Sequence, residues 1–506
     1  MFGLDETGSL PQLLRAAAER YGNGPAYVEG TTTLSYAELL ERVRAVAQGY
    51  VAHGLEPGGR VVVWAPNSID WAVAALAVTY AGGTLVPANS RYTGHEVADI
   101  VDRTGAVIVV AADGFLGRTQ IADLQAASEL PSVRSVVDIA DLDELDQSHV
   151  SPDQVEARAD AVARDDVADI LFTSGTTGRA KGAMSAHRQT IGVSAAWAEL
   201  GGVTSDDRYL VVNPFFHSFG YKIGIVVGLL TGATLYPVAT FDVDETMRLI
   251  DSERITLFPG APTLYQSLLA APNRGDYDLG SLRLAVTGAA VVPVVLIERM
   301  RAPAPEGLGI DQVVTAFGMT EAVVATMCRE DDSAEVVATT CGRAVPGMEA
   351  RIDAPKGEAG ELLLRGDYVM LGYLDDEEAT REAVDADGWL HTGDVGTLDE
   401  HGNLSITDRL KDMYISGGFN VYPAEVEQAL MRMDGIQDVA VVGVPDERMG
   451  EVGKAYVVGS TTAEDVIAFA KERLANFKVP RHVALVDALP RNLSGKVLKT
   501  ELRDGS

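Results

Sequence analysis

Short apolar runs rich in valine, isoleucine and leucine recur along the first two thirds of the chain, each bounded by glycine, proline or polar residues. The runs begin at Val61, Ala106, Asp169, Tyr209, Ile255, Leu282 and Val313. Runs that are apolar throughout are typical of strands buried on both faces, as in parallel sheets. Longer apolar segments between them, such as residues 68–82, fit helices. The pattern predicts an α/β fold with stacked, mostly parallel sheets covered by helices.

The pattern changes after about residue 350, where shorter runs alternate with Gly and Asp turns. Segments 360–366 and 403–410 have the length and composition of hairpin strands, which indicates a small barrel-like or antiparallel part. An acidic, alanine-rich stretch at residues 141–166 is interpreted as a solvated connection.

The last part of the chain alternates β and α patterns. Amphipathic helical segments at residues 424–433 and 463–474 flank two β-branched runs. We therefore predict a large N-terminal domain, residues 1–410, and a small, mobile α+β C-terminal domain, residues 411–506.

Composition narrows the class of protein. The 506 residues are 47% hydrophobic and 23% charged, as in ordinary soluble enzymes. A net charge of -32 repels phosphate backbones and anionic lipid, so neither nucleic acid nor stable membrane insertion is expected. Two cysteines form no disulfide framework, and the start of the chain lacks a signal-peptide pattern. A cytoplasmic location is the simplest interpretation. The apolar stretch at residues 223–239 is too interrupted to span a bilayer and fits a helix, a turn and a buried strand.

The segment LFTSGTTGRAKG, residues 171–182, has the composition of a phosphate-binding loop. Its glycines let the backbone approach an anion, its hydroxyls donate hydrogen bonds, and Lys181 adds positive charge. The spacing is not that of a Walker loop, and no GxGxxG dinucleotide motif occurs elsewhere. On composition alone, a flexible surface loop remains an alternative.

The chain resembles the adenylate-forming superfamily of acyl-CoA synthetases, luciferases and peptide-synthetase adenylation domains, over nearly its whole length. After TSGTTGRAKG, the matching motifs follow in the family's order: PFFHSFG, VTGAA, FGMTE, HTGD, DRLKDMYISGGFNVYPAEVE and PRNLSGKVLK. Three positions depart from the family's pattern, with Ala180 for Pro before the loop lysine, Asp408 for Gly and Phe317 for Tyr. None of these changes removes a reactive group, although Ala180 is expected to loosen the loop.

The resemblance implies an ATP site. The residues it places around ATP or AMP are Thr173, Ser174, Gly175, Thr176, Thr177, Gly178, Lys181, Gly288, Ala289, Ala290, Phe317, Gly318, Met319, Thr320, Asp394, Arg409 and Lys496. Phe317 is expected to stack on adenine, and Asp394 to accept hydrogen bonds from the ribose hydroxyls, assisted by Arg409. Glu321 is expected to bind Mg²⁺ through a hard carboxylate oxygen. Without this context, a Thr-Glu pair is more typical of a helix cap.

The resemblance also implies an acyl pocket, formed by His217, Gly220, Tyr221, Lys222, Gly288 and Met319. His217 is expected to gate the pocket and orient the substrate carboxylate. A lysine is unusual beside an alkyl chain. Lys222 therefore either faces the pocket and meets a substrate oxygen or a carboxylate, or it points to solvent or an ion pair. The run NPFFHSFGYKIG is similar to actinobacterial CoA ligases of steroid degradation that act on a keto-bearing ring propanoate. A bulky cyclic keto acid is therefore the expected substrate.

Lys496 matches the family's lysine that bridges the substrate carboxylate and the α-phosphate. Attack of one anion on another needs a cation, which fits this role. Thr173, His217 and Glu321 complete the expected catalytic set. The resemblance places a hinge at Lys411, about which the small domain rotates between the two half-reactions. Gly417, Gly418 and Phe419 are then expected to line the coenzyme A path.

We therefore expect an ATP-dependent acid–thiol ligase that uses a small carboxylic acid, ATP, Mg²⁺ and coenzyme A. The alternatives are a medium- or long-chain fatty acid CoA ligase and a carrier-protein adenylation domain. Adenylation domains hold a substrate ammonium with an Asp, where this chain has Gly220. A luciferase and a non-catalytic nucleotide-binding protein are further alternatives. The oligomeric state is left open, with a homodimer as one possibility.

Overall fold

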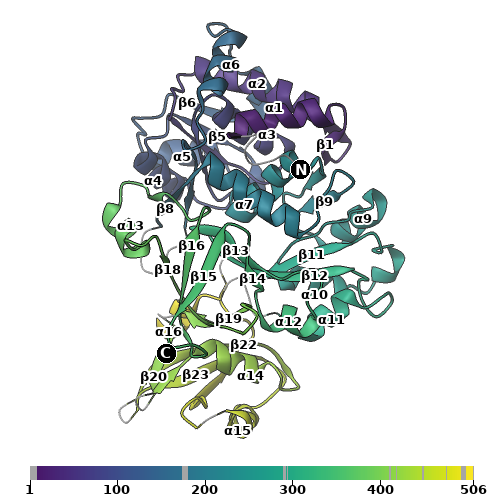
Figure 1. The fold of residues 1–506 in the computed structure, drawn as a ribbon, viewed down its shortest axis with the longest axis vertical. Coiled ribbons are helices and arrows are strands. Elements are labelled where there is room, and N and C mark those ends of the chain that lie inside the picture. The colour runs from purple at the N-terminus through teal and green to yellow at the C-terminus, as the bar shows by residue number, and fades with distance from the viewer. Residues whose placement is uncertain are drawn as a thin grey trace.

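The computed structural model describes residues 8–173, 180–288, 292, 294–409, 412–416, 419–446, 449–474, 476–491 and 497–504 (Figure 1). Layers of sheet and helix form the N-terminal part, and the C-terminal elements lie together at the opposite end of the molecule (Figure 1). The predicted α/β class is confirmed by sheets of mixed direction alternating with helices along the chain.

A seven-stranded sheet carries the phosphate-loop segment. Its order is β17 (Gly372–Tyr373), β8 (Gly182–Ala186), β7 (Val167–Phe172), β4 (Thr84–Pro87), β3 (Arg60–Trp64), β5 (Ile108–Ala111) and β6 (Ser135–Asp138). The strands from β7 to β6 are parallel. Strand β8 runs antiparallel to both of its neighbours, β7 and β17. The apolar runs predicted as buried strands at Val61, Ala106 and Asp169 are therefore confirmed.

Two further sheets have four strands each. The first has the order β2 (Thr32–Ser35), β1 (Pro25–Glu29), β10 (Thr234–Pro237) and β9 (Arg208–Val211), and the second β11 (Leu284–Gly288), β12 (Gln312–Met319), β13 (Ala322–Met327) and β14 (Arg343–Ala344). The run at Ile255 forms no strand of its own. Leu257 instead makes single bridges to Tyr209 and Leu284, so it joins the two sheets.

Helices cover these sheets. They are α1 (Leu10–Tyr21), α2 (Tyr36–Ala52), α3 (Ile69–Tyr80), α4 (Gly94–Thr104), α5 (Gln120–Ala127), α6 (Pro152–Ala161), α7 (His187–Leu200), α8 (Val227–Thr231), α9 (Val243–Glu253), α10 (Pro262–Ala270), α11 (Val294–Arg301), α12 (Ala334–Thr339) and α13 (Glu377–Ala383), with 3-10 turns η1 (Phe115–Gly117), η2 (Ile139–Glu144) and η4 (Arg274–Asp276) and a π-helix η3 (Phe219–Val226). Ser68 caps α3 by accepting from the Trp71 N–H. Because α3 lies in the core, it is apolar around most of its surface, with Asp70 in its first turn as the charged exception.

The interpretation of residues 141–166 as a solvated connection is wrong. Helix α6 occupies part of this stretch, with a capping box at Ser151, and it buries Val155 and Ala159. Glu156 on the same helix pairs with Arg15 and Arg44. Burial of only two small apolar side chains leaves little periodic signal, which is why composition misled the prediction.

The barrel-like part is an antiparallel sheet of β15 (Met348–Asp353), β16 (Gly360–Gly366), β18 (Leu390–Leu398) and β19 (Leu404–Arg409).

The C-terminal elements are β20 (Tyr414–Ser416), β21 (Phe419–Val421), α14 (Pro423–Leu430), β22 (Ile436–Asp446), β23 (Gly450–Gly459), α15 (Ala463–Arg473), β24 (His482–Leu485) and α16 (Lys499–Asp504). They enclose their own apolar clusters, one of which contains Tyr414, Val441 and Val457. The predicted boundary between Leu410 and Lys411 falls outside the described residues and stays a prediction.

Both cysteines, Cys328 and Cys341, are free thiols. Within the described ranges, every helix is too short or too polar to cross a bilayer.

We expect the contact between α1 and α7 at His187 to weaken in acid. Its Nδ1 accepts a hydrogen bond from the Leu10 N–H at 3.2 Å, and burial lowers the pKa of His187 to about 4. The unfolded chain therefore binds more protons at His187 than the folded protein does between pH 6.5 and 4. The contribution of neutral His187 to the free energy of unfolding falls as the pH falls through this range. The loss approaches about 3 kcal/mol by pH 4. Urea unfolding at pH 7 and 4.5 should show a smaller drop for His187→Gln than for the unsubstituted protein. Equal drops would contradict this assignment.

Candidate active site

The phosphate-loop segment is the connection of the β7–β8 hairpin. The Thr173 N–H donates to the Lys181 carbonyl at 2.9 Å and closes the base of the connection. The Arg103 guanidinium donates to the Ala180 carbonyl at 2.6 Å and lies over the Phe172 ring. This contact anchors the position at which the family's proline is missing. The five predicted residues from Ser174 to Gly178 lie outside the described residues.

Lys181, Tyr373 and Glu321 come together beside this loop. The Lys181 Nζ lies 5.0 Å from the centre of the Tyr373 ring, a cation–π distance. The Tyr373 hydroxyl donates to Glu321 Oε1 at 2.7 Å, and burial together with the Glu321 carboxylate raises the pKa of Tyr373. Tyr373 is therefore the donor that orients the carboxylate predicted to bind metal. It also links that carboxylate to the positive charge at the end of the loop.

Thr320 and Glu321 form the two-residue connection of the β12–β13 hairpin, since Met319 pairs with Ala322. The helix cap that this dipeptide alone suggests is absent. Phe317 precedes the turn and is only partly buried, which leaves part of its ring accessible for stacking.

Two glycines near Phe317, one after it in the chain and one on the neighbouring strand, lie where the backbone passes too close to other main-chain atoms for a side chain. A Cβ on Gly318 would lie 1.8 Å from the Val323 carbonyl oxygen. A Cβ on Gly288, at the end of the neighbouring strand β11, would lie 2.7 Å from the Ala316 carbonyl oxygen. Gly288 and Ala316 are register partners, so the structure brings the VTGAA and FGMTE motifs together at one edge.

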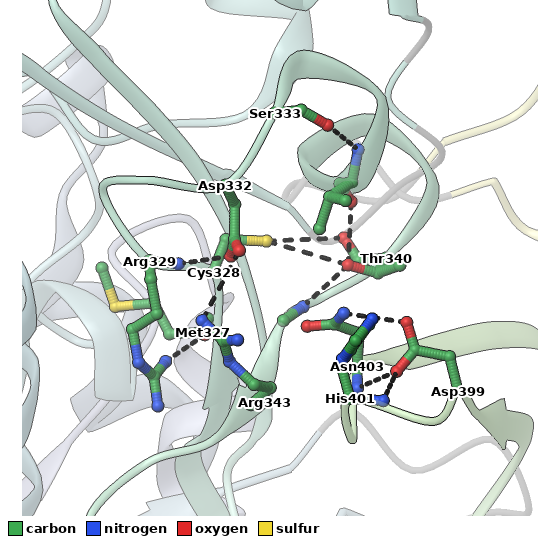
Figure 2. Close-up of polar contacts among 12 residues, drawn as sticks. Met327, Cys328, Arg329, Asp332, Ser333, Thr340, Arg343, Asp399, His401 and Asn403 are labelled. Carbon is green, nitrogen blue, oxygen red and sulfur yellow. Dashed lines mark hydrogen bonds and ion pairs between the residues drawn. The ribbon is translucent and has the colours of Figure 1, made fainter.

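Buried polar contacts of β12 fix the strand that carries Phe317. The Thr315 hydroxyl on β12 contacts Cys328 Sγ at 3.1 Å and donates to the Thr340 carbonyl at 2.7 Å. Figure 2 shows the adjoining contacts, in which Asp332 accepts from the Arg329 N–H and pairs with Arg343. The connection that follows β13 is thereby fixed against the strand that carries Phe317.

Asp394 and Arg409 are register partners on β18 and β19. The two residues expected to bind ribose are therefore adjacent, and Asp394 is only 4% exposed. Nearby, the Asp399 carboxylate accepts hydrogen bonds from the His401 N–H, the Asn403 N–H and the Asn403 side chain, which holds the β18–β19 turn (Figure 2).

The HTGD motif is held in place by Glu361 on β16. One carboxylate oxygen of Glu361 accepts from the Gly393 N–H at 3.0 Å, and the other lies 2.9 Å from His391 Nδ1. This bridging carboxylate fixes the backbone directly before Asp394.

His217 lies between Pro214 and the π-helix η3. His217 is exposed to solvent, and desolvation by the neighbouring protein atoms lowers the pKa of its imidazole. The imidazole is therefore neutral near pH 7. Its Nδ1 accepts from the Phe219 N–H at 3.3 Å, so Nε2 carries the proton of the neutral ring. A donor at this place suits contact with a carboxylate oxygen.

Gly220 and Tyr221 are both buried. A Cβ on Gly220 would lie 2.0 Å from the Pro214 carbonyl oxygen, so no larger residue fits the observed backbone. The Tyr221 ring lies 6.2 Å from the Trp71 ring in an edge-on contact. Contact of either residue with an acyl substrate stays a prediction.

Lys222 occupies a buried ion pair. Its Nζ lies 3.0 Å from Asp169 Oδ1, and the two side chains are 2% and 0% exposed. The ammonium also donates to Ser185 Oγ at 2.8 Å. Burial lowers the pKa of Lys222, and the Asp169 carboxylate opposes this shift. Of the two alternatives in the sequence analysis, the structure shows the ion pair, and direct contact with an acyl substrate stays a prediction.

Several predicted residues lie outside the described residues: Ala289, Ala290, Lys411, Gly417, Gly418 and Lys496. The backbones of Arg409 and Phe419 belong to β19 and β21, but their side chains fall outside the description. The predicted hinge and coenzyme A path therefore stay predictions.

The described residues contain no group of three or more His, Cys, Asp or Glu side chains arranged to hold a metal ion. Glu321 supplies a single carboxylate beside the loop. This donor fits Mg²⁺ that takes its other ligands from phosphates and water, as in many nucleotide sites.

Comparison with known proteins agrees with this geometry. The profile of the AMP-binding enzymes matches residues 14–374, and that of the AMP-binding enzyme C-terminal domain matches residues 425–496. The chain belongs to the AMP-binding enzyme family. It is 55% identical to a 3-(7a-methyl-1,5-dioxo-octahydro-1H-inden-4-yl)propanoyl:CoA ligase of Rhodococcus jostii and 53% identical to the ligase of that name from Mycobacterium tuberculosis, with 99% of each chain covered. The crystal structure of ATP-bound MatB from Rhodopseudomonas palustris is similar with a TM-score of 0.84 and 30% identity, covering 98% of this chain and 99% of that one.

Sequence reasoning about this AMP-binding enzyme missed four residues that hold the site. Tyr373 lies in a segment for which no element was predicted, and Glu361 lies in a segment predicted only as a strand. Arg103 lies on a helix that is far away in the sequence. Asp169 was counted among apolar strand residues. An acidic residue within the run ADILF was the one signal of a buried ionic partner.

Proposed function

We propose that this AMP-binding enzyme joins a carboxylic acid to coenzyme A in two steps. The substrate carboxylate attacks the α-phosphorus of ATP, the bond to the β-phosphate breaks, and pyrophosphate leaves. The thiolate of coenzyme A then attacks the acyl carbonyl, the carbon–sulfur bond forms, and AMP leaves. The thiol proton passes to solvent. Membership of the family and the likeness to ATP-bound MatB support the use of ATP.

The proposed acid is the 7a-methyl-1,5-dioxo-octahydroindenyl propanoate, a bicyclic keto acid left from steroid rings. The observation that carries this proposal is the identity of 53–55%, over 99% of each chain, to two ligases from different organisms with this acid in their names. Medium- or long-chain fatty acids are the alternative substrates.

The residues are proposed to act as follows. Lys181 and the hydroxyls of the loop hold the phosphates, and Glu321 binds Mg²⁺, which neutralises phosphate charge when bound. Asp394 and Arg409 bind ribose, and Phe317 stacks on adenine. His217 donates to the substrate carboxylate, and Lys496 bridges that carboxylate and the α-phosphate. Lys411 is the hinge, and Gly417, Gly418 and Phe419 line the coenzyme A path.

An adenylation domain serving a carrier protein would need a carboxylate for the substrate ammonium. The Pro214 carbonyl leaves no space for a side chain at Gly220, which weighs against that alternative. A luciferase would consume oxygen after adenylation, so an oxygen electrode separates that alternative.

The test is a competition between the bicyclic keto propanoate and octanoate at equal concentrations, with ATP, Mg²⁺ and coenzyme A. We expect at least about tenfold preference for the bicyclic acid, equal to ~1.4 kcal/mol in transition-state binding. Products are measured by mass spectrometry. Acyl-AMP and pyrophosphate should form without coenzyme A. A preference for octanoate would assign the enzyme to the fatty acid class, and release of ADP would exclude the adenylate mechanism.

A further inference from the structure

The buried pair of Lys222 and Asp169 connects two parts of the proposed site. Asp169 lies on β7 and Ser185 on β8, and these two residues are register partners. The β7–β8 connection is the phosphate loop. The Lys222 ammonium, which comes from η3, contacts both residues, so it reaches across both strands that carry the loop.

Further contacts fix both partners. The Thr190 hydroxyl on α7 donates to Asp169 Oδ2 at 2.7 Å. One turn further along α7, the Ser194 Oγ lies 2.7 Å from the backbone carbonyl oxygens of both Lys222 and Thr190, which share its single proton. Helix α7 thus holds both the carboxylate and the backbone of the π-helix, and the pair has a single fixed geometry.

The Lys222–Asp169 pair is linked to the proposed acid site through η3. The π-helix starts two residues after His217, whose accessible ring is proposed to meet the substrate carboxylate. A movement of the phosphate-loop strands therefore reaches His217 through Lys222 and one short helical segment. Single-turn π-helical segments are frequent at functional sites, which agrees with a working role for η3.

The free energy of burying two charges argues against a purely stabilising role for the Lys222–Asp169 pair. The desolvation of two buried charges largely offsets their attraction, and apolar replacements of such pairs are often neutral. A buried pair defines a geometry more than it adds stability, because any shift leaves charges unpaired. The pair here defines the geometry between the phosphate loop and the acyl side.

We propose that Lys222 is a positioning residue that couples ATP binding to acid binding. When ATP binds at the β7–β8 connection, β7 and β8 fix Lys222, and Lys222 fixes η3 and His217 in the geometry that accepts the acid. Acid and ATP therefore bind with positive cooperativity, through the strands and the π-helix that Lys222 connects. This inference rests on the proposed function, which supplies the roles of the phosphate loop and His217 and the acid chosen in the assay.

The first experiment uses the unsubstituted protein and no acid. Hydrogen exchange of η3 amides is measured with and without Mg²⁺ and a non-hydrolysable ATP analogue. We expect slower exchange in both β7–β8 and η3 on addition of the analogue, and no change in α9, which lies away from the loop along the chain. Slower exchange in β7–β8 with unchanged exchange in η3 would overturn the coupling. Because no acid is present, the result is independent of the proposed substrate.

The second experiment compares the protein with the Asp169→Asn, Lys222→Met double variant. Asparagine keeps an acceptor for Thr190 and methionine keeps chain length, so no buried charge is left alone. Calorimetry measures acid affinity with and without the ATP analogue. We expect the unsubstituted protein to bind acid at least ~5-fold more tightly with the analogue, and the double variant to lose this difference while its affinity for the analogue alone stays within about twofold.

Arg283→Met provides the control. Arg283 pairs with Asp207, and their charged atoms lie 2.5 Å apart. Neither residue belongs to β7, β8 or η3, so loss of Arg283 should lower stability and leave the cooperativity intact. Retained cooperativity in the double variant would show that the pair is only structural and overturn the proposal. If the double variant does not fold, the hydrogen-exchange result alone decides.

Discussion

Lys496→Ala is expected to slow acyl-adenylate formation by about 100- to 1,000-fold, the usual cost of losing one group that stabilises transition-state charge. The proposed role of Lys496 is to offset repulsion between two anions, and this role ends when the adenylate has formed. Thioester formation from supplied acyl-AMP should therefore change less than about tenfold. Pyrophosphate exchange measures the first step, and release of AMP from supplied adenylate measures the second.

Lys499→Ala is the matched control for this result. Lys499 lies three residues further on and pairs with Glu427 at 2.8 Å, with side-chain exposures of 17% and 15%. Its loss removes the same charge from the same part of the chain but should spare adenylation. Equal slowing of both half-reactions by Lys496→Ala would contradict a role confined to the first step.

Lys411→Pro is expected to have the opposite effect. Proline fixes φ near -65° and removes the backbone N–H, so a hinge at this position loses its freedom to rotate. Adenylation should stay near its normal rate, while thioester formation falls at least about tenfold, as for ~1.4 kcal/mol of added barrier. Single-turnover measurements of each half-reaction separate the two rates.

Lys411→Ala distinguishes rotation from charge. Alanine removes the ammonium but leaves φ free, so it should retain thioester formation. If the alanine variant is as slow as the proline variant, the lysine side chain rather than the backbone is responsible. If Lys411→Pro retains full thioester formation, the hinge lies elsewhere.

Much of the fold could be predicted because buried parallel strands leave an unmistakable pattern. The run at Val61 is apolar throughout and the run at Val313 nearly so, with Thr315 as its polar residue, and they form β3 and β12. The segment 223–239 was also predicted correctly as helix, turn and strand, since its glycines and proline interrupt an apolar run. Helix α6 was missed because its packing depends on ion pairs of Glu156 with distant arginines.

The site was predictable only as far as its motifs are contiguous. Met319 to Glu321 could be expected in one turn because they follow one another, and the β12–β13 hairpin places them there. Tyr373 could not be found this way, because 52 residues separate it from Glu321 and its single hydroxyl carries the contact. The partner of Lys222 was equally hidden, since only the folded sheet brings Asp169 beside η3.

The tight contact at Gly220 sets a limit for redesigning the enzyme. An acidic residue introduced there to select amino-acid substrates would meet the Pro214 carbonyl before its carboxylate reached any ligand. A change of substrate class at this place therefore needs a different path for the main chain between Pro214 and η3. Laboratory evolution by point substitution should find new acids through neighbouring side chains and leave this glycine unchanged, whereas recruitment of an ammonium-binding group would require an exchange of the whole segment.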